Sequence, residues 1–95
     1  MTLTVEPGFY RPDEMGIRHE NLCEVVALGD GWLGLESMAF VPFNRQLIDV
    51  AMLTMPERVW IDDYHRQVRE RVSPLLGDDD VIAWLETATK PLADY

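Results

Sequence analysis

Cysteine is nearly absent from this 95-residue sequence, in which Cys23 is the only one. A single thiol excludes an intrachain disulfide and any metal cluster built from several cysteines. It is also weakly consistent with a reducing compartment. Cys23 lies within an apolar segment, where a small buried thiol is the expected interpretation.

Histidine is almost as scarce, since only His19 and His65 occur. No serine lies in a Gly-x-Ser-x-Gly turn, so the sequence offers no nucleophilic triad. We interpret His65 as a residue on the surface of a helix and not as a ligand. The aspartates at 78–80 lack the ligand loop of an EF-hand, and we interpret them as the solvated start of a helix.

Basic residues are few. The sequence has eight Lys and Arg but 17 Asp and Glu, which gives a formal net charge of −9. This balance argues against nucleic acid and anionic membranes as partners, since both attract clustered Lys and Arg. The sequence contains no run of about 18 apolar residues, which is the length that a membrane-spanning helix needs. The N-terminus also lacks the basic start and apolar stretch of a signal peptide, so we expect a cytoplasmic protein.

The remaining composition, with 47% hydrophobic residues, is enough for one modest core. Three segments alternate apolar and polar residues as β-strands do, at 2–6, 17–28 and 33–41. Pro7-Gly8 is expected to stop the first strand, and Gly29-Asp30-Gly31 is a turn signal between the other two.

The second half of the sequence changes to helical spacing. Thr54 and Glu57 form a capping box at a helix start, and Ser73-Pro74 ends or kinks that helix. The apolar stripe between them consists of Trp60, Ile61, Tyr64, Val68 and Val72. Asp78 to Asp80 cap a short final helix, which carries Trp84. Both Trp84 and Trp60 are expected in the core or in an interface. The sequence therefore predicts an α+β fold, with three antiparallel strands followed by two helices.

Two glutamates, Glu6 and Glu20, lie at the edges of apolar, β-prone segments, where a carboxylate costs free energy unless something pairs with it. If the first two strands form a hairpin, both carboxylates converge and could bind Mn²⁺, Co²⁺ or Zn²⁺. A salt bridge to Arg18, or simple exposure at the end of a sheet, explains them as well. Two carboxylates alone are too few for a dinuclear hydrolytic site.

The stretches TVEPGFY at 4–10 and GIRHENL at 16–22 resemble the end of the catalytic domain of pita-bread metallopeptidases. Among these, the chain most resembles the Xaa-Pro aminopeptidases. The stretches 31–42, 47–49 and 60–65 resemble the C-terminal extension of the larger members. The resemblance implies catalytic-domain strands over residues 1–42 and the helical extension over 43–95.

Members of that family hold two divalent ions, usually manganese, through two Asp, one His and two Glu, and hydrolyse the bond before proline. The resemblance implies that the two Glu are Glu6 and Glu20. Glu6 would bind one ion and take part in proton transfer, and Glu20 would bridge both ions. Arg18 would orient these ligands from a second layer. His19 replaces an aliphatic residue, which we interpret as a packing change.

The Asp and His ligands of that family would lie upstream, and this sequence does not contain them. We therefore expect a C-terminal fragment, or a gene prediction begun at an internal Met, with weak metal binding or none and negligible peptidase activity. One alternative is a non-catalytic binding or dimerisation module, since strands without sheet neighbours self-associate or seek a partner. A less favoured alternative is a small stand-alone metal-binding protein.

Overall fold

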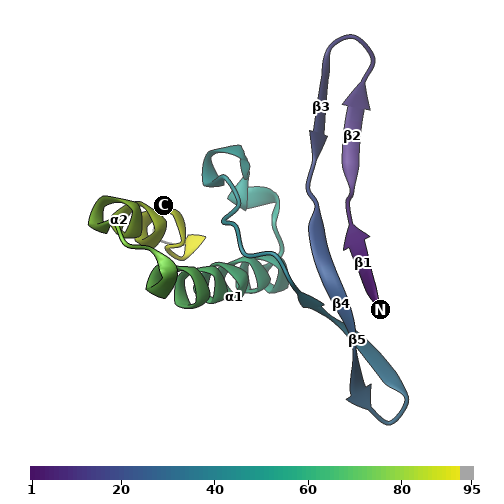
Figure 1. The fold of residues 1–95 in the computed structure, drawn as a ribbon. Helices are drawn as coiled ribbons and strands as arrows, with labels where there is room; N and C mark the ends of the chain where they lie inside the picture. The colour runs from purple at the N-terminus through teal and green to yellow at the C-terminus, as the bar shows by residue number, and fades with distance from the viewer. Residues whose placement is uncertain (93–95) are drawn as a thin grey trace. The chain divides into compact units, whose positions relative to one another are not determined.

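The computed structural model describes residues 1–92. The chain divides into two compact units, of which the first runs from Met1 to Ala39 and the second begins at Phe40. The first unit contains the described strands and the second contains the helices (Figure 1). The predicted α+β class, with a three-stranded antiparallel sheet followed by two α-helices, is confirmed.

The first unit is built from two antiparallel ladders. Strand β4 (Asn21–Gly29) lies between β1 (Thr2–Val5) and β5 (Trp32–Ser37) in a three-stranded sheet. Strands β2 (Gly8–Arg11) and β3 (Met15–Arg18) form a separate two-stranded ladder. This second ladder continues the line of β1 and β4 (Figure 1).

The limits of the first predicted strands need correction. The first strand ends at Val5, just before Pro7-Gly8, as predicted. A strand that was not predicted, β2, follows directly, because Phe9 and Tyr10 favour a strand and the tight turn comes only at residues 11–14. In that turn Glu14 N–H donates to the Arg11 carbonyl at 3.2 Å. The predicted long strand at 17–28 is interrupted at residues 19–20, opposite Pro7, which has no N–H to donate.

The third strand ends at Ser37 and not at residue 41. The Ser37 hydroxyl donates to the Ala39 carbonyl at 2.9 Å, which offers the backbone a local alternative to the ladder. The turn before this strand is the predicted one. Asp30 and Gly31 have φ values of +53° and +80°, as a two-residue type I′ hairpin turn requires.

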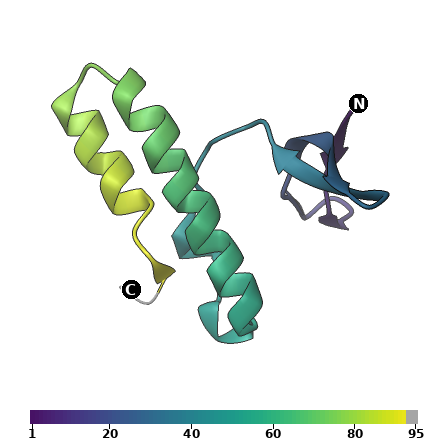
Figure 2. The ribbon, with the colours of Figure 1, turned by 90° about the horizontal axis from the view of Figure 1, so that it is seen from below.

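The helices begin where their capping residues predict. Helix α1 (Met55–Val72) starts after Thr54, whose N–H donates to the Glu57 carboxylate at 2.7 Å in a complete capping box. It ends before Pro74, as predicted, and α2 (Asp79–Ala88) follows the N-cap Asp78. The two helices lie side by side (Figure 2). Neither they nor any other helix in residues 1–92 has the length and apolarity that a membrane span requires.

The core of the helical unit lies between α1 and α2 and contains Tyr64, Val68 and Leu85. Trp60 and Trp84 are not part of it, because they remain 56% and 61% exposed. The Trp60 ring nevertheless stacks on Tyr64, with 5.7 Å between the ring centroids. The apolar stripe of α1 is therefore core only in its C-terminal half.

His65 is fully buried, which corrects its interpretation as a residue on the surface of a helix. Its Nε2 accepts a hydrogen bond of 3.0 Å from the backbone N–H of Phe43, in the segment before α1. Burial lowers the pKa of His65, nearby Arg45 and Arg69 lower that pKa further, and Asp62 raises it. The hydrogen bond requires the neutral imidazole, so protonation and folding oppose each other at this residue.

Acid is therefore expected to destabilise the helical unit through His65. The stabilising contribution is complete above the usual imidazole pKa of about 6.5 and is lost as the pH falls through the lower pKa of the folded state. The free energy of unfolding should fall by at most about 1.4 kcal/mol per pH unit for this proton. The effect is measured by urea unfolding, monitored by the helical circular dichroism signal, at about one pH unit above and one below the usual imidazole pKa.

His65→Gln isolates this contribution, because glutamine can accept the Phe43 N–H bond but does not titrate. This variant should show a flatter dependence of stability on pH. His19→Gln, at an exposed position of the first unit, is the matched control and should keep the dependence of the original chain. If the stability of the His65→Gln variant depends on pH as that of the original chain does, His65 is not the cause of the loss of stability in acid.

Candidate functional site

The two ladders of the first unit share one antiparallel register. Val5 pairs with Asn21 in the β1–β4 ladder, and Gly8 pairs with Arg18 in the β2–β3 ladder. Between them, His19 N–H donates to the Pro7 carbonyl at 3.0 Å. Stepping from either ladder into the gap therefore places residue 6 opposite residue 20.

Glu6 and Glu20 form the cross-strand pair in this gap. The adjacent pair, Pro7 and His19, is hydrogen-bonded through its single available N–H. Because the two kinds of pair alternate, Glu6 and Glu20 form a non-hydrogen-bonded pair, in which facing side chains approach most closely. Both carboxylates thus project from the same face of the hairpin.

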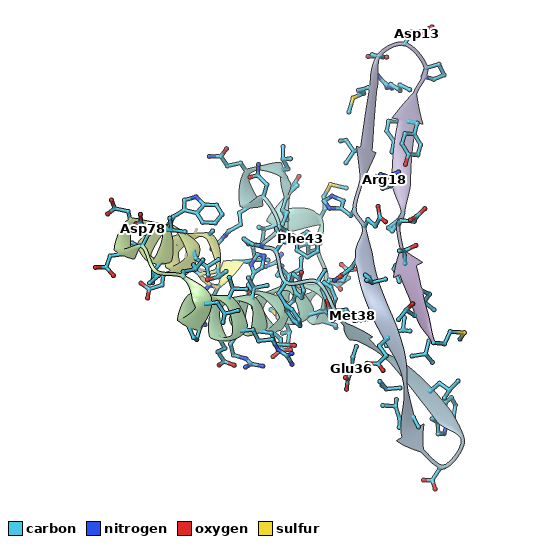
Figure 3. The ribbon with its side chains drawn as sticks, in the orientation of Figure 1. Asp13, Arg18, Glu36, Met38, Phe43 and Asp78 are labelled. Atoms are coloured by element: carbon cyan, nitrogen blue, oxygen red, sulfur yellow. The ribbon has the colours of Figure 1, made fainter. Side chains whose placement is uncertain are left out.

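Each carboxylate contacts the side chain two residues before it. Arg18 Nε lies 3.3 Å from Glu20 Oε2, next to the junction of the two ladders (Figure 3). Thr4 Oγ1 donates to Glu6 Oε2 at 3.0 Å. The sequence reasoning missed Thr4, although strand alternation places residues i and i+2 on one face.

The Arg18–Glu20 ion pair also provides the structural explanation that the sequence left open for Glu20. Its two side chains are 54% and 42% exposed, so water screens their attraction. An exposed ion pair of this kind adds little to stability. Its main effect is to hold one oxygen of Glu20 toward the strand that precedes it.

Two glycines on the same face make room for Tyr10. A Cβ atom on Gly8 would lie 2.5 Å from the Tyr10 hydroxyl oxygen, and one on Gly16 would lie 2.8 Å from Tyr10 Cδ1. The Tyr10 ring therefore crosses from its own strand to β3. It lies at the end of the carboxylate face nearest the turn.

The opposite face of the strands is mostly apolar, although Asn21 and Ser37 also lie on it, joined by a hydrogen bond of 2.8 Å. The register places on it Leu3, Val5, Phe9, Ile17, Cys23, Val25, Leu33 and Leu35. His19 falls on this apolar face because it pairs with Pro7. Cys23 is buried, as predicted.

The carboxylate pair fits part of a metal centre. Carboxylate oxygens are hard donors that suit Mn²⁺ and related divalent ions. The Oε1 atoms of Glu6 and Glu20 receive no hydrogen bond from the described residues. Within residues 1–92, however, no group of three or more His, Cys, Asp or Glu is arranged to hold an ion. The pair can supply two ligands of a centre completed by other residues.

Comparisons with known proteins agree on one family. Residues 31–92 match the family described as the C-terminal region of peptidase M24. A probable Xaa-Pro aminopeptidase P from Coprinopsis cinerea is 41% identical over 97% of this chain, which corresponds to 16% of that protein. Aminopeptidase P2 from Arabidopsis thaliana is 38% identical over 98% of this chain and 14% of its own length.

One solved structure matches both units of the chain. It is the X-prolyl aminopeptidase of Caenorhabditis elegans, a cytosolic enzyme with a di-nuclear active site, and the TM-score is 0.85 at 36% identity. The match covers 95% of this chain and 16% of that chain. The chain thus spans about a sixth of the length of these relatives.

Gly16→Ala tests the arrangement of the carboxylate face. The new methyl group would occupy the space of the Tyr10 ring, so the ring must move. We expect large chemical-shift changes for the Tyr10 ring and faster amide exchange across β2 and β3.

Gly77→Ala is the matched control, because a Cβ at this position meets nothing within 4 Å. It should leave the Tyr10 signals and the hairpin amides unchanged. Tyr10 signals that are identical in the Gly16→Ala variant and the original chain would refute the placement of the ring.

Proposed function

The chain belongs to the family of C-terminal regions of M24 peptidases, and from this premise we propose that it forms the C-terminal part of a dinuclear Xaa-Pro aminopeptidase. The resemblance that the TVEPG and GIRHEN segments predict is confirmed by relatives that match nearly the whole chain. The cytosolic location of the Caenorhabditis elegans enzyme supports a cytoplasmic location here as well.

The cross-strand position of Glu6 and Glu20 is the single observation that supports this proposal most strongly. Both carboxylates would be metal ligands, with Glu20 shared between two ions. Glu6 would also accept or return a proton during the reaction, as a positioned carboxylate can. Arg18 would keep Glu20 oriented through its 3.3 Å contact.

Manganese is the metal we propose, with cobalt or zinc as alternatives that oxygen ligands also accept. Two such ions supply Lewis-acid chemistry, since they polarise a carbonyl and make water more acidic. The substrate would be a peptide with proline at its second position. The residues of this chain would contribute ligand oxygens, their orientation and a proton acceptor on one polar face.

The remaining ligands would come from outside these residues. Metal affinity depends on a complete ligand set, so the chain alone should bind Mn²⁺ weakly. Peptidase activity should be negligible for the same reason. A complete enzyme therefore has to be assembled before the roles of Glu6 and Glu20 can be measured.

A second candidate function is a non-catalytic module that self-associates into a homodimer. The apolar face of the strands favours it, because Phe9, Leu33 and Leu35 are 58%, 66% and 53% exposed. Such a module would need no carboxylate at residues 6 and 20. Removing these carboxylates should therefore impair the enzyme and leave the non-catalytic module unaffected.

A chimeric enzyme tests the proposal. The Coprinopsis cinerea relative, with its matching segment replaced by this chain, should bind Mn²⁺ and release the N-terminal residue of an X-Pro peptide. Glu6→Gln and Glu20→Gln should each lower kcat/KM by at least about 100-fold, because even partners of metal ligands contribute 10–100-fold. The 95-residue chain alone should release no product.

Glu14→Gln is the matched control for these substitutions. Glu14 is an exposed carboxylate of the same hairpin that pairs with Arg11 at 3.2 Å. Its loss should leave kcat/KM and metal content unchanged. Full activity and full metal content in the Glu6→Gln and Glu20→Gln chimeras would refute the proposal and favour the non-catalytic module.

A further inference from the structure

Thr4 lies where it can control the orientation of Glu6. Its hydroxyl donates to Glu6 Oε2 at 3.0 Å. Thr4 belongs to β1 and pairs with Leu22 of β4, so the ladder fixes its backbone. Glu6 lies just beyond β1, where the pairing is interrupted opposite residue 20. The donor is therefore on a regular strand and the acceptor on the irregular segment that follows.

The side chain of Glu6 needs such a partner if it is to present one oxygen in one direction. A glutamate has several rotatable bonds and loses much rotamer freedom when it is fixed. Thr4 is β-branched and stiff at χ1, so its hydroxyl is a donor in a nearly fixed place. A hydrogen bond to a carboxylate is also stronger than a neutral one.

Glu20 has a parallel arrangement in which the partner is a charged group and the contact is an ion pair. Arg18 Nε lies 3.3 Å from Glu20 Oε2, again from two residues upstream on the same face. In both glutamates Oε2 is thus engaged and Oε1 receives no hydrogen bond from the described residues. The Thr4 hydroxyl differs in being neutral, so it orients Glu6 without neutralising its charge.

We propose that Thr4 is a positioning residue for Glu6, whose hydroxyl engages Oε2 and leaves Oε1 as the oxygen offered to a divalent cation. This inference rests on the proposed role of Glu6 as a metal ligand. Thr4 itself touches neither cation nor substrate and acts only through the Glu6 carboxylate. The guanidinium of Arg18 acts on Glu20 in the same way.

A threonine in a strand can also be there only because β-branched residues favour strands. Two substitutions separate this structural role from positioning. Thr4→Val keeps the branched shape and the strand preference but removes the hydroxyl, whereas Thr4→Ser keeps the hydroxyl and removes the methyl group. A purely structural role is preserved by valine, and a positioning role is preserved by serine.

The first measurement uses the 95-residue chain without metal. Three-bond NMR couplings along the Glu6 side chain report how narrowly its rotamers are distributed. We expect one dominant rotamer in the original chain and in Thr4→Ser, and averaged couplings in Thr4→Val. Thr2→Val removes a hydroxyl from the same face one strand step earlier, and it should leave Glu6 unchanged. Unchanged Glu6 couplings in Thr4→Val would overturn the inference.

The second measurement determines the Mn²⁺ affinity of the chimeric enzyme by calorimetry. Thr4→Val should weaken Mn²⁺ binding by about 10–100-fold, the usual effect of losing a partner of a metal ligand. Thr4→Ser should bind Mn²⁺ as the unsubstituted chimera does. Equal affinity in Thr4→Val would overturn the role of Thr4 toward the metal.

The two measurements also separate this inference from the proposed function. Averaged Glu6 couplings in Thr4→Val, together with a fully active Glu6→Gln chimera, would confirm the positioning of Glu6 and refute its role as a ligand. An inactive Glu6→Gln chimera, with unchanged couplings and unchanged Mn²⁺ affinity in Thr4→Val, would keep the proposed function and reject Thr4 as its positioning residue.

Discussion

The antiparallel pairing that continues from β1–β4 into β2–β3 fixes which side chains share a face. Pro7 interrupts the ladder because it cannot donate, yet its carbonyl accepts from His19 N–H at 3.0 Å, so the register survives the interruption. A slip by one residue would move the side chains of a whole strand to the other face. The position of Glu20 relative to Glu6 depends on this one hydrogen-bonded pair and on the ladders beside it.

The backbone, and not the carboxylates themselves, brings Glu6 and Glu20 together. Like charges that face each other across a sheet are unfavourable. Glu6 Oε2 accepts a hydrogen bond from Thr4, and Glu20 Oε2 forms an ion pair with Arg18. These exposed contacts add little stability, so their value lies in orientation. A divalent cation bound to both oriented carboxylates would relieve the repulsion between them.

Local chemistry predicted the elements whose signals are complete within a few residues. The capping box of Thr54 and Glu57 set the start of α1. The two glutamates of the site were singled out because they lie at the edges of apolar, β-prone segments. Pro7-Gly8 correctly marked the end of β1. Strand β2 directly after it was missed because its formation depends on pairing with β3. His65 was misplaced because its acceptor role depends on Phe43, 22 residues away. Thr4 was missed because a threonine in a strand looks like a simple β-former.

The most direct test of the central claim is the distance between the backbones of Glu6 and Glu20 in solution. In a non-hydrogen-bonded antiparallel pair the Cα atoms are about 4.5 Å apart, so the two Hα protons nearly touch. We predict a strong nuclear Overhauser effect between Glu6 Hα and Glu20 Hα. A strong effect from Glu6 Hα to the Hα of His19 or Asn21 instead would mean a shifted register with the carboxylates on opposite faces, and would contradict the claim.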